Sequence, residues 1–395
     1  MEPDFTGYVF PNDFHILWSL MIVIYPYVTG LVAGAFIVSS LYHVFQRREL
    51  RPVARLSMVA SLAFLLVATL PLLAHLGHPE RALNIVTTPH FTSAMAAFGV
   101  IYTLYLILVV FEIWLVYRKE IILLARRSRG LKRWIFATLA LGVYDISDEA
   151  QRIDRRAVIV LASLGIPAAC ILHGYVGFMF GSVKANPLWS TPLMPVIFLF
   201  SAVTSGVAMV MVLYQTLMKF SGKRIESECV QSLASWLWLF AVVTVTLELL
   251  EIVTLAYEHG EEWVVVGELI THKIAFSFIG LQMVIGALIP FLLLGIVVLM
   301  RPFLTDPLRN TIAFIAAFLL LIQVFSMRWN VVVGGQIFSK SMVGFRELYV
   351  PELFGREGIG LALVIVLIPF VFLMLFNRFL PLYETVEEQE ADLSH

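Results

Sequence analysis

The chain has 395 residues, of which 60% are hydrophobic and 14% are charged, and its formal net charge is −1. Soluble proteins average about 45–50% apolar residues, so an ordinary soluble domain is excluded. The basic residues form short clusters rather than one extended face, which argues against nucleic-acid binding. Only two cysteines occur, without a CxxC pair, so the chain cannot hold an iron–sulfur cluster by itself, and no metal site is expected.

Nine apolar runs are long enough to cross a membrane, since a bilayer core of about 30 Å needs about 20 helical residues. They cover residues 15–45, 54–77, 93–117, 157–182, 189–218, 229–257, 272–300, 310–333 and 357–380. The predicted fold is therefore an all-α polytopic protein that passes through the cytoplasmic membrane about nine times.

The distribution of Lys and Arg sets the predicted orientation. The links after spans 1, 3, 5 and 7, together with Arg55 and Arg378, carry 20 of the 27 basic residues, and the other side carries seven. The N-terminus is thus predicted outside and the C-terminus inside. The outer segment 328–356 holds most of the outer basic residues and is a candidate docking surface for an acidic partner.

The predicted organisation places two helical bundles in sequence. A likeness between VTGLVAGAFIVSSLYHVF (28–45) and VTSGVAMVMVLYQTLMKF (203–220) favours two four-helix bundles plus one extra helix. The segments are an outer N-terminal segment 1–14, a first bundle 15–182, a second bundle 183–333, an outer loop 334–356, a last helix 357–380 and a cytoplasmic acidic tail 381–395.

Span 1 contains Gly30 and Gly34, a small-xxx-small pair. Such pairs are typical of closely packed membrane helices, and this packing role is the one we predict. Close approach of the backbone to a flat ligand is the alternative.

Titratable groups gather in HLGHPERALNIVTTPHFTSAM (75–95), between spans 2 and 3. A quinone needs an apolar slot and polar groups that bind its carbonyl oxygens and exchange protons, and His and Tyr suit that role. The candidates in the outer half of the chain are Tyr25, His75, His78, Arg81, Ser93 and His173. Hydrogen bonding at helix ends is the simpler alternative. A haem held by His75 and His173 is a further one, but no second histidine pair accompanies it.

Three carboxylates fall inside predicted spans, where a charge costs roughly 2.5–3.5 kcal/mol on insertion scales. Glu112 lies near the inner end of span 3, and Glu248 and Glu251 lie on one face of span 6 at a separation of three residues. We interpret them as proton-transfer groups. Interhelical hydrogen bonds from neutral carboxyls are the alternative.

Several of these stretches resemble the NrfD/PsrC family of quinone-reactive membrane subunits from polysulfide-reductase-like complexes. LGHPERALNIVTTPHFTSAM (76–95) is similar to the family loop with an LGxP…N…TSPM-like pattern, GLVAGAF (30–36) to its Gly-rich helix, and FEIW (111–114) to its span-end glutamate. Residues 172–210 resemble the longer, hydrogenase-linked branch, and within it DsrP subunits linked to dissimilatory sulfite reduction. His75 and His78 stand where many members have Asp and Arg, and Ala94 replaces the proline of TSPM.

The resemblance implies a quinone, menaquinone or another, held in the outer half of the first bundle, with Tyr25 facing it. It also implies a periplasmic ferredoxin-like iron–sulfur subunit on the outer face and other membrane and cytoplasmic subunits, so that no haem or iron–sulfur cluster is needed in this chain. The chain would be a subunit of a quinone-linked oxidoreductase complex rather than a stand-alone enzyme. An ion-translocating or transporter-like subunit and a chemically silent membrane anchor remain the alternatives.

Overall fold

The computed structural model of the protein describes residues 15–90, 92–258, 260–338 and 344–383. The predicted outer segment 1–14 and residues 384–395 of the predicted acidic tail lie outside the described residues.

The described residues form nine helices or helical pairs that are long and apolar enough to cross a membrane, which confirms the predicted all-α polytopic fold. In chain order these are α1 (Leu20–His43), α2 with α3 (Arg51–Leu65 and Leu70–His75), α5 (Ala94–Val116), α8 (Asp148–Gly181), α9 (Met194–Phe220), α10 (Ser227–Glu258), the π-helical η4 with α12 (Phe276–Leu288 and Ile289–Leu299), α13 with η6 and α14 (Asp306–Trp329, Asn330–Gly334 and Gly335–Ile337) and α15 (Ile359–Asn377).

Shorter helices connect the spans on both sides. They are η1 (Arg48–Leu50), η2 (Pro79–Arg81), α4 (Asn84–Thr87), α6 (Arg118–Arg127), α7 (Gly130–Leu139), α11 (Glu261–Glu268), the π-helical η3 (Leu269–Lys273) and η5 (Arg301–Phe303). Helix α8 begins nine residues before the predicted start of its span, at residue 148 rather than 157. The Ser147 hydroxyl accepts from the Ala150 N–H and caps the helix.

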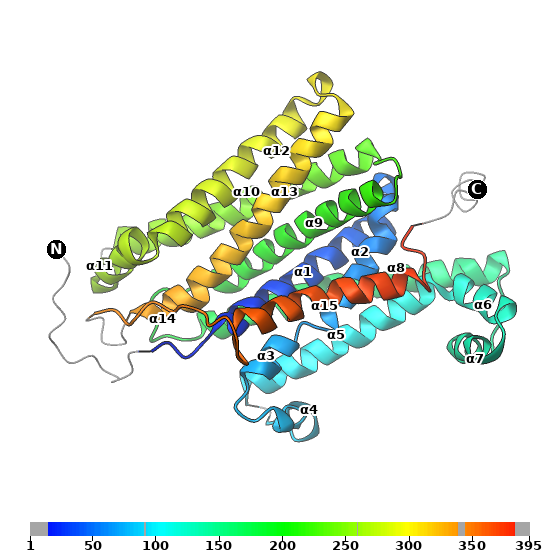
Figure 1. The fold of residues 1–395 in the computed structure, drawn as a ribbon, viewed down its shortest axis with the longest axis horizontal. Helices are drawn as coiled ribbons and strands as arrows, with labels where there is room; N and C mark the ends of the chain where they lie inside the picture. The colour runs from blue at the N-terminus through cyan, green and yellow to red at the C-terminus, as the bar shows by residue number, and fades with distance from the viewer. Residues whose placement is uncertain (1–14, 91, 259, 339–343, 384–395) are drawn as a thin grey trace.

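Helices α1 and α9 lie at the centre of the molecule (Figure 1). Helix α1 packs against α2, α8 and α9, and α5 packs against α2 and α8. On the other side, α9 packs against α10 and α13, which also contact η4 and α12. The last span, α15, lies against α2 and α1. Two groups of four spans therefore meet along α1 and α9, and one span lies outside both.

The two central helices approach each other through glycines. A Cβ added to Gly34 would lie 2.6 Å from the Gly206 Cα, and one added to Gly206 would lie 2.3 Å from the Gly34 Cα. A Cβ on Gly30 would lie 3.4 Å from the Ala202 Cα and 3.3 Å from the His173 ring. Small residues thus allow backbone contact between α1 and α9, as expected for membrane helices.

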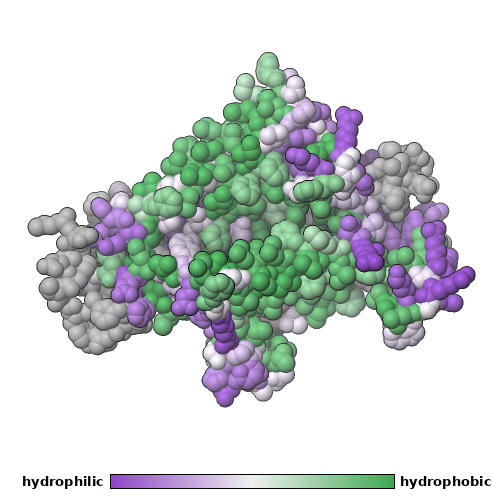
Figure 2. Space-filling view, in the orientation of Figure 1, coloured by the Kyte–Doolittle hydropathy of each residue, from purple (hydrophilic) through white to green (hydrophobic). Residues whose placement is uncertain are grey.

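The surface is divided into an apolar middle and polar ends. Figure 2 shows hydrophobic side chains across the middle of the bundle and hydrophilic ones gathered at both ends. Large apolar side chains on the lipid-facing sides of the spans are exposed, among them Val160, Leu164, Leu363 and Val371. Such an apolar belt is the surface that lipid tails cover in a membrane protein.

Candidate functional site

One titratable pair of the predicted site lies at the C-terminal end of α3. The Nδ1 atom of His75, the last residue of α3, is 3.2 Å from a carboxylate oxygen of Glu357, which precedes α15. The two side chains are 25% and 37% exposed. Both therefore sit at a boundary where protons can reach them.

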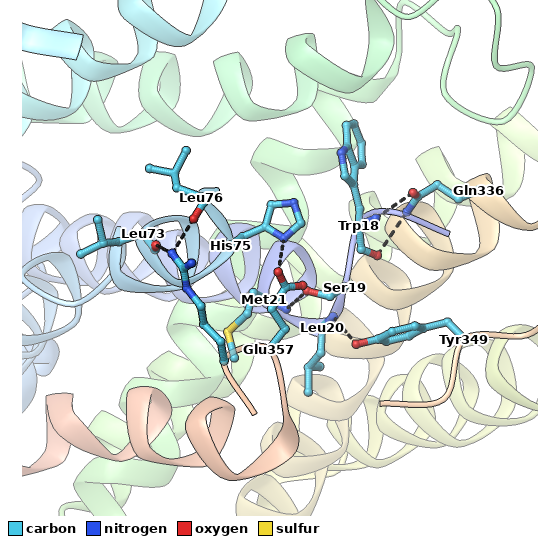
Figure 3. Close-up of polar contacts among 11 residues, drawn as sticks. Trp18, Ser19, Leu20, Met21, Leu73, His75, Leu76, Gln336, Tyr349 and Glu357 are labelled. Carbon is cyan, nitrogen blue, oxygen red and sulfur yellow. Dashed lines mark hydrogen bonds and ion pairs between the residues drawn. The ribbon is translucent and has the colours of Figure 1, made fainter. Parts of the chain in front are cut away.

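Neighbouring contacts hold this pair in place, as Figure 3 shows. Arg356 donates a hydrogen bond to the Leu73 carbonyl at 3.2 Å and another to the Leu76 carbonyl, both at the free C-terminal end of α3. Cations at this end of a helix are favoured by its dipole. Arg356 therefore holds the loop before α15 against α3. In the sequence it is one of the outer basic residues that could contact an acidic partner.

The beginning of α1 is tied to the second group of helices beside the same pair (Figure 3). The Trp18 N–H donates to the Gln336 side-chain oxygen at 3.0 Å, and the Gln336 side-chain nitrogen donates to the Trp18 carbonyl at 3.3 Å. The Leu20 N–H donates to the Tyr349 hydroxyl at 3.2 Å. These bonds satisfy backbone groups where α1 begins and fix its outer end.

Tyr25 lies on α1 four residues, and thus about one helical turn, after Met21. Its ring meets the Phe98 ring of α5 edge-on, with centroids 5.5 Å apart. Tyr25 is 4% exposed, and its hydroxyl has no hydrogen-bond partner among the described residues. A buried hydroxyl without a partner is uncommon, so this atom is available to a ligand.

His173 is fully buried and is held by an arginine. The Nη2 atom of Arg328 donates to His173 Nε2 at 3.0 Å, to the Ser201 hydroxyl at 2.8 Å and to the Phe198 carbonyl at 3.2 Å. The guanidinium also lies over the Phe198 ring, 3.8 Å from its centroid. A guanidinium can only donate, so His173 Nε2 accepts and its proton resides on Nδ1, which has no partner among the described residues.

The position of Arg328 corrects the sequence interpretation. The charge count places it on the outer side. In the structure it lies in α13, fully buried among α8, α9 and α13. Removing it from the outer count leaves six basic residues there (7 − 1 = 6), against 20 on the predicted inner side, and the orientation stays a prediction.

A chain of amides surrounds Glu248 in the second group of helices. Gln282 of η4 donates to its carboxylate at 2.8 Å, and Gln323 of α13 donates at 3.0 Å and 3.1 Å. Asn330 donates to the Gln282 carbonyl oxygen at 2.7 Å, and the Ser277 hydroxyl donates to Asn330 at 2.6 Å. The carboxylate thus has a continuous polar path along η4 and η6, both π-helical, a geometry frequent at functional sites.

The two other predicted proton-transfer carboxylates have different surroundings. Glu251 is partly buried and, with Glu248, lines a small cavity of about 40 Å³. That volume is enough for water molecules, which need about 10–15 Å³ each by this measure. Glu112 of α5 is fully buried, and neither of its oxygens has a hydrogen-bond partner among the described residues. It is not connected to Glu248 by any described hydrogen bond.

The remaining predicted quinone ligands lie in the outer loop. His78 is exposed and contacts Glu80 at 2.9 Å, and Arg81 is exposed. Ser93 caps α5 by accepting a hydrogen bond from the Ala96 N–H at 3.4 Å. The described contacts do not join these three residues to Tyr25 or His173, and as quinone ligands they stay predictions.

The predicted ligands therefore divide between two sides of α1. Tyr25 and Gly30 are five residues apart, so the two positions lie about 140° apart around the helix. Tyr25 faces α5, whereas Gly30 faces His173 and α9. Helix α3, which ends at His75, also packs on α1. The groups on α1, α3 and α5 fit a quinone: an unpartnered buried hydroxyl, aromatic rings and a His–carboxylate pair.

Sequence reasoning missed several partners of these residues. Glu357 gave no signal, because a lone glutamate before an apolar run is ordinary at the end of a span. Gln282 and Gln323 carry no charge and do not stand out in a span, although buried amides opposite a buried glutamate are natural hydrogen-bond partners. Arg328 did carry a signal, since it falls within the predicted span 310–333.

The comparison with family models gives a match over residues 11–340 to the model described as polysulphide reductase, NrfD. Three curated relatives illustrate the range of similar proteins. A selenate reductase subunit of Mesobacillus selenatarsenatis is 34% identical over 203 residues, which cover 50% of this chain and 47% of the relative.

A protein NrfD homolog of Haemophilus influenzae is 25% identical over 341 residues, covering 83% of this chain and 98% of the relative. The Hdr-like menaquinol oxidoreductase integral membrane subunit of Archaeoglobus fulgidus is 23% identical over 217 residues, covering 55% and 46%. The match thus spans about half the length of the first and third of these relatives.

Proposed function

The chain belongs to the polysulphide reductase NrfD family, and we propose that it is the quinone-reactive membrane subunit of a multi-subunit oxidoreductase complex. The names of two relatives, a selenate reductase subunit and a menaquinol oxidoreductase membrane subunit, support this role. The observation that carries it is the unpartnered Tyr25 hydroxyl on α1, the helix against which α3 packs with the partly exposed His75–Glu357 pair at its end.

A bound menaquinol would supply two electrons and two protons. The Tyr25 hydroxyl is a donor for one of its carbonyl or hydroxyl oxygens, in an apolar wall that includes Phe98. His75, beside Glu357, is the group that accepts a released proton, and its exposure lets that proton leave to the outer side. Positioned acid–base groups of this kind typically contribute about 10²–10⁴-fold to a rate.

The partners follow from the same proposal. This chain has two free cysteines and so holds no cluster of its own by cysteine ligation, and electrons leave to a separate subunit. We assign that subunit as a periplasmic ferredoxin-like iron–sulfur protein docked on the predicted outer face, with further membrane and cytoplasmic subunits in the complex. A role in sulfur-compound metabolism, sulfite included, is the finer part of the proposal and rests on the resemblance of residues 172–210.

The experiment is menaquinol oxidation by the purified complex carrying Tyr25→Phe or His75→Gln. Both variants should lower the rate by about tenfold or more, because each removes one acid–base or donor group. His90→Gln is the matched control, since His90 is an exposed histidine of the same loop whose Nδ1 bonds to Thr92. Unchanged rates in both variants, with intact assembly, would overturn the site assignment.

Proton translocation by the second group of helices is a second candidate, favoured by the amide-lined Glu248 and the adjoining cavity. Glu248→Gln tests it in proteoliposomes that hold the complex. Loss of redox-coupled acidification with retained quinol oxidation would support it, and unchanged acidification would contradict it. Solute uptake by the chain without an electron donor would instead favour a transporter.

A further inference from the structure

A large cavity opens at the opposite end of the first group of helices, where α1 and α5 end and α8 begins. Its volume is about 560 Å³, and its wall includes His43, Arg48, Lys119 and Ile159. By the same measure a water molecule needs about 10–15 Å³, so the space suits a group of many heavy atoms. None of the residues in its wall belongs to the candidate quinone site.

The polar part of the cavity wall is cationic. It contains five basic residues, Arg48, Arg51, Arg55, Lys119 and Arg155, and three acidic ones, Glu120, Asp148 and Asp154. The formal balance of these groups is +2 (5 − 3 = 2) with His43 neutral. Arg55 contacts Glu120 at 2.7 Å, and Asp154 accepts two bonds from Arg118 at 2.7 Å and 2.8 Å, so two of the three acids are already neutralised by cations.

One wall residue also has an unsatisfied polar atom. His43, the last residue of α1, contributes a buried Nε2 atom that has no hydrogen-bond partner among the described residues. Its ring contacts that of Tyr42, which also lines the cavity. A buried ring nitrogen without a partner is available to a ligand as a hydrogen-bond donor or acceptor.

The rest of the wall is apolar and belongs to the spans. Leu115 and Val116 are near the end of α5, and Val158 and Ile159 lie in α8 where its apolar run begins. The cavity therefore has a cationic part at the height of lipid headgroups and an apolar part that continues toward the membrane interior. Ile159 is 39% exposed, which leaves this side open to lipid.

The geometry points to a binding site for one anionic phospholipid, with its phosphate at Arg48 and Lys119 and its acyl chains along α8. Basic pockets between spans on the cytoplasmic side are suited to anionic headgroups. Charge complementarity selects an anion, and the apolar wall selects a lipid over a soluble anion. The neighbouring α7 exposes Leu131 and Trp134, as a helix lying in the membrane interface does.

The test uses native mass spectrometry of the full chain, exchanged into micelles with phosphatidylglycerol or phosphatidylcholine. The wild-type chain should retain phosphatidylglycerol, and Arg48→Gln with Lys119→Gln should weaken this retention about 10- to 30-fold. The control is Lys219→Gln with Arg224→Gln, which removes the same charge from exposed positions of the same end that do not line the cavity. It should bind phosphatidylglycerol as the wild type does.

Three outcomes would overturn the proposal. Equal losses in the two double variants would indicate a general surface-charge effect. Displacement of the lipid by inorganic phosphate would assign a soluble anion instead. Stronger lipid retention after deletion of residues 384–395 would make the acidic end of this chain the natural occupant.

Discussion

Replacing Gly34 by alanine should weaken the contact between α1 and α9. The added Cβ would lie 2.6 Å from both the Ala202 carbonyl oxygen and the Gly206 Cα, and 2.8 Å from the Val203 carbonyl oxygen. All three are backbone atoms, which cannot rotate away as the end of a side chain can. Ordinary contact begins at 3.4 Å, so the helices must separate by about 0.8 Å (3.4 − 2.6 = 0.8).

The expected cost follows from the effect of overpacking. Forcing extra atoms into a packed interior typically costs about 1–3 kcal/mol. Alanine regains about 1 kcal/mol of helix propensity over glycine, so a control with the same gain is needed. Gly174→Ala in α8 provides it, because the nearest atom to its added Cβ is 3.9 Å away. Relative to Gly174→Ala, Gly34→Ala should unfold with a free energy about 2 kcal/mol lower.

The measurement is reversible unfolding of the purified chain in mixed micelles by titration with a denaturing detergent. Both variants are compared with the wild type at equal micelle composition. If Gly34→Ala is as stable as Gly174→Ala, the two central helices do not make backbone contact at this position, and the glycine-mediated packing of α1 on α9 is wrong.

Two further predictions concern buried and half-buried charges. Arg328→Met should lower the free energy of unfolding by about 2 kcal/mol, because three hydrogen-bond acceptors lose their donor at about 0.6 kcal/mol each. An unchanged free energy in the same detergent titration would contradict the stabilising role of this arginine. Arg118 and Asp154 form an ion pair with two hydrogen bonds, and their side chains are 13% and 18% exposed. A double-mutant cycle with Arg118→Gln and Asp154→Asn should give a coupling free energy of about 1 kcal/mol. A coupling near zero would show that the pair does not stabilise the fold.

The spans could be predicted from the sequence because a single physical quantity, the length of an apolar helix, decides them. The count of basic residues placed Arg328 wrongly, since it treats every arginine as a residue outside the membrane, although Arg328 falls within the predicted span 310–333. What holds it inside is a set of three acceptors from two other helices: the His173 ring of α8, and the Phe198 carbonyl and the Ser201 hydroxyl of α9. Such long-range partners cannot be read from neighbouring residues.

The candidate site shows the same division between local and long-range information. Sequence reasoning weights His75 and His173 equally, because both lie at the outer ends of spans. Their partners make them different: a carboxylate from the loop before α15 faces His75, whereas a guanidinium from α13 faces His173. These partners lie 282 (357 − 75) and 155 (328 − 173) positions away along the chain, beyond the reach of any motif.

This difference bears directly on proton chemistry. His75 has a carboxylate partner, Glu357, at a partly exposed helix end where protons can reach both groups. The Arg328 guanidinium donates to His173 Nε2, so that atom accepts and Nδ1 is the hydrogen-bond donor of this ring. On helix α1, Tyr25 faces α5 and Gly30 faces His173. We therefore propose His75 for proton release, whereas His173, held by Arg328 of α13, joins the first group of helices to the second.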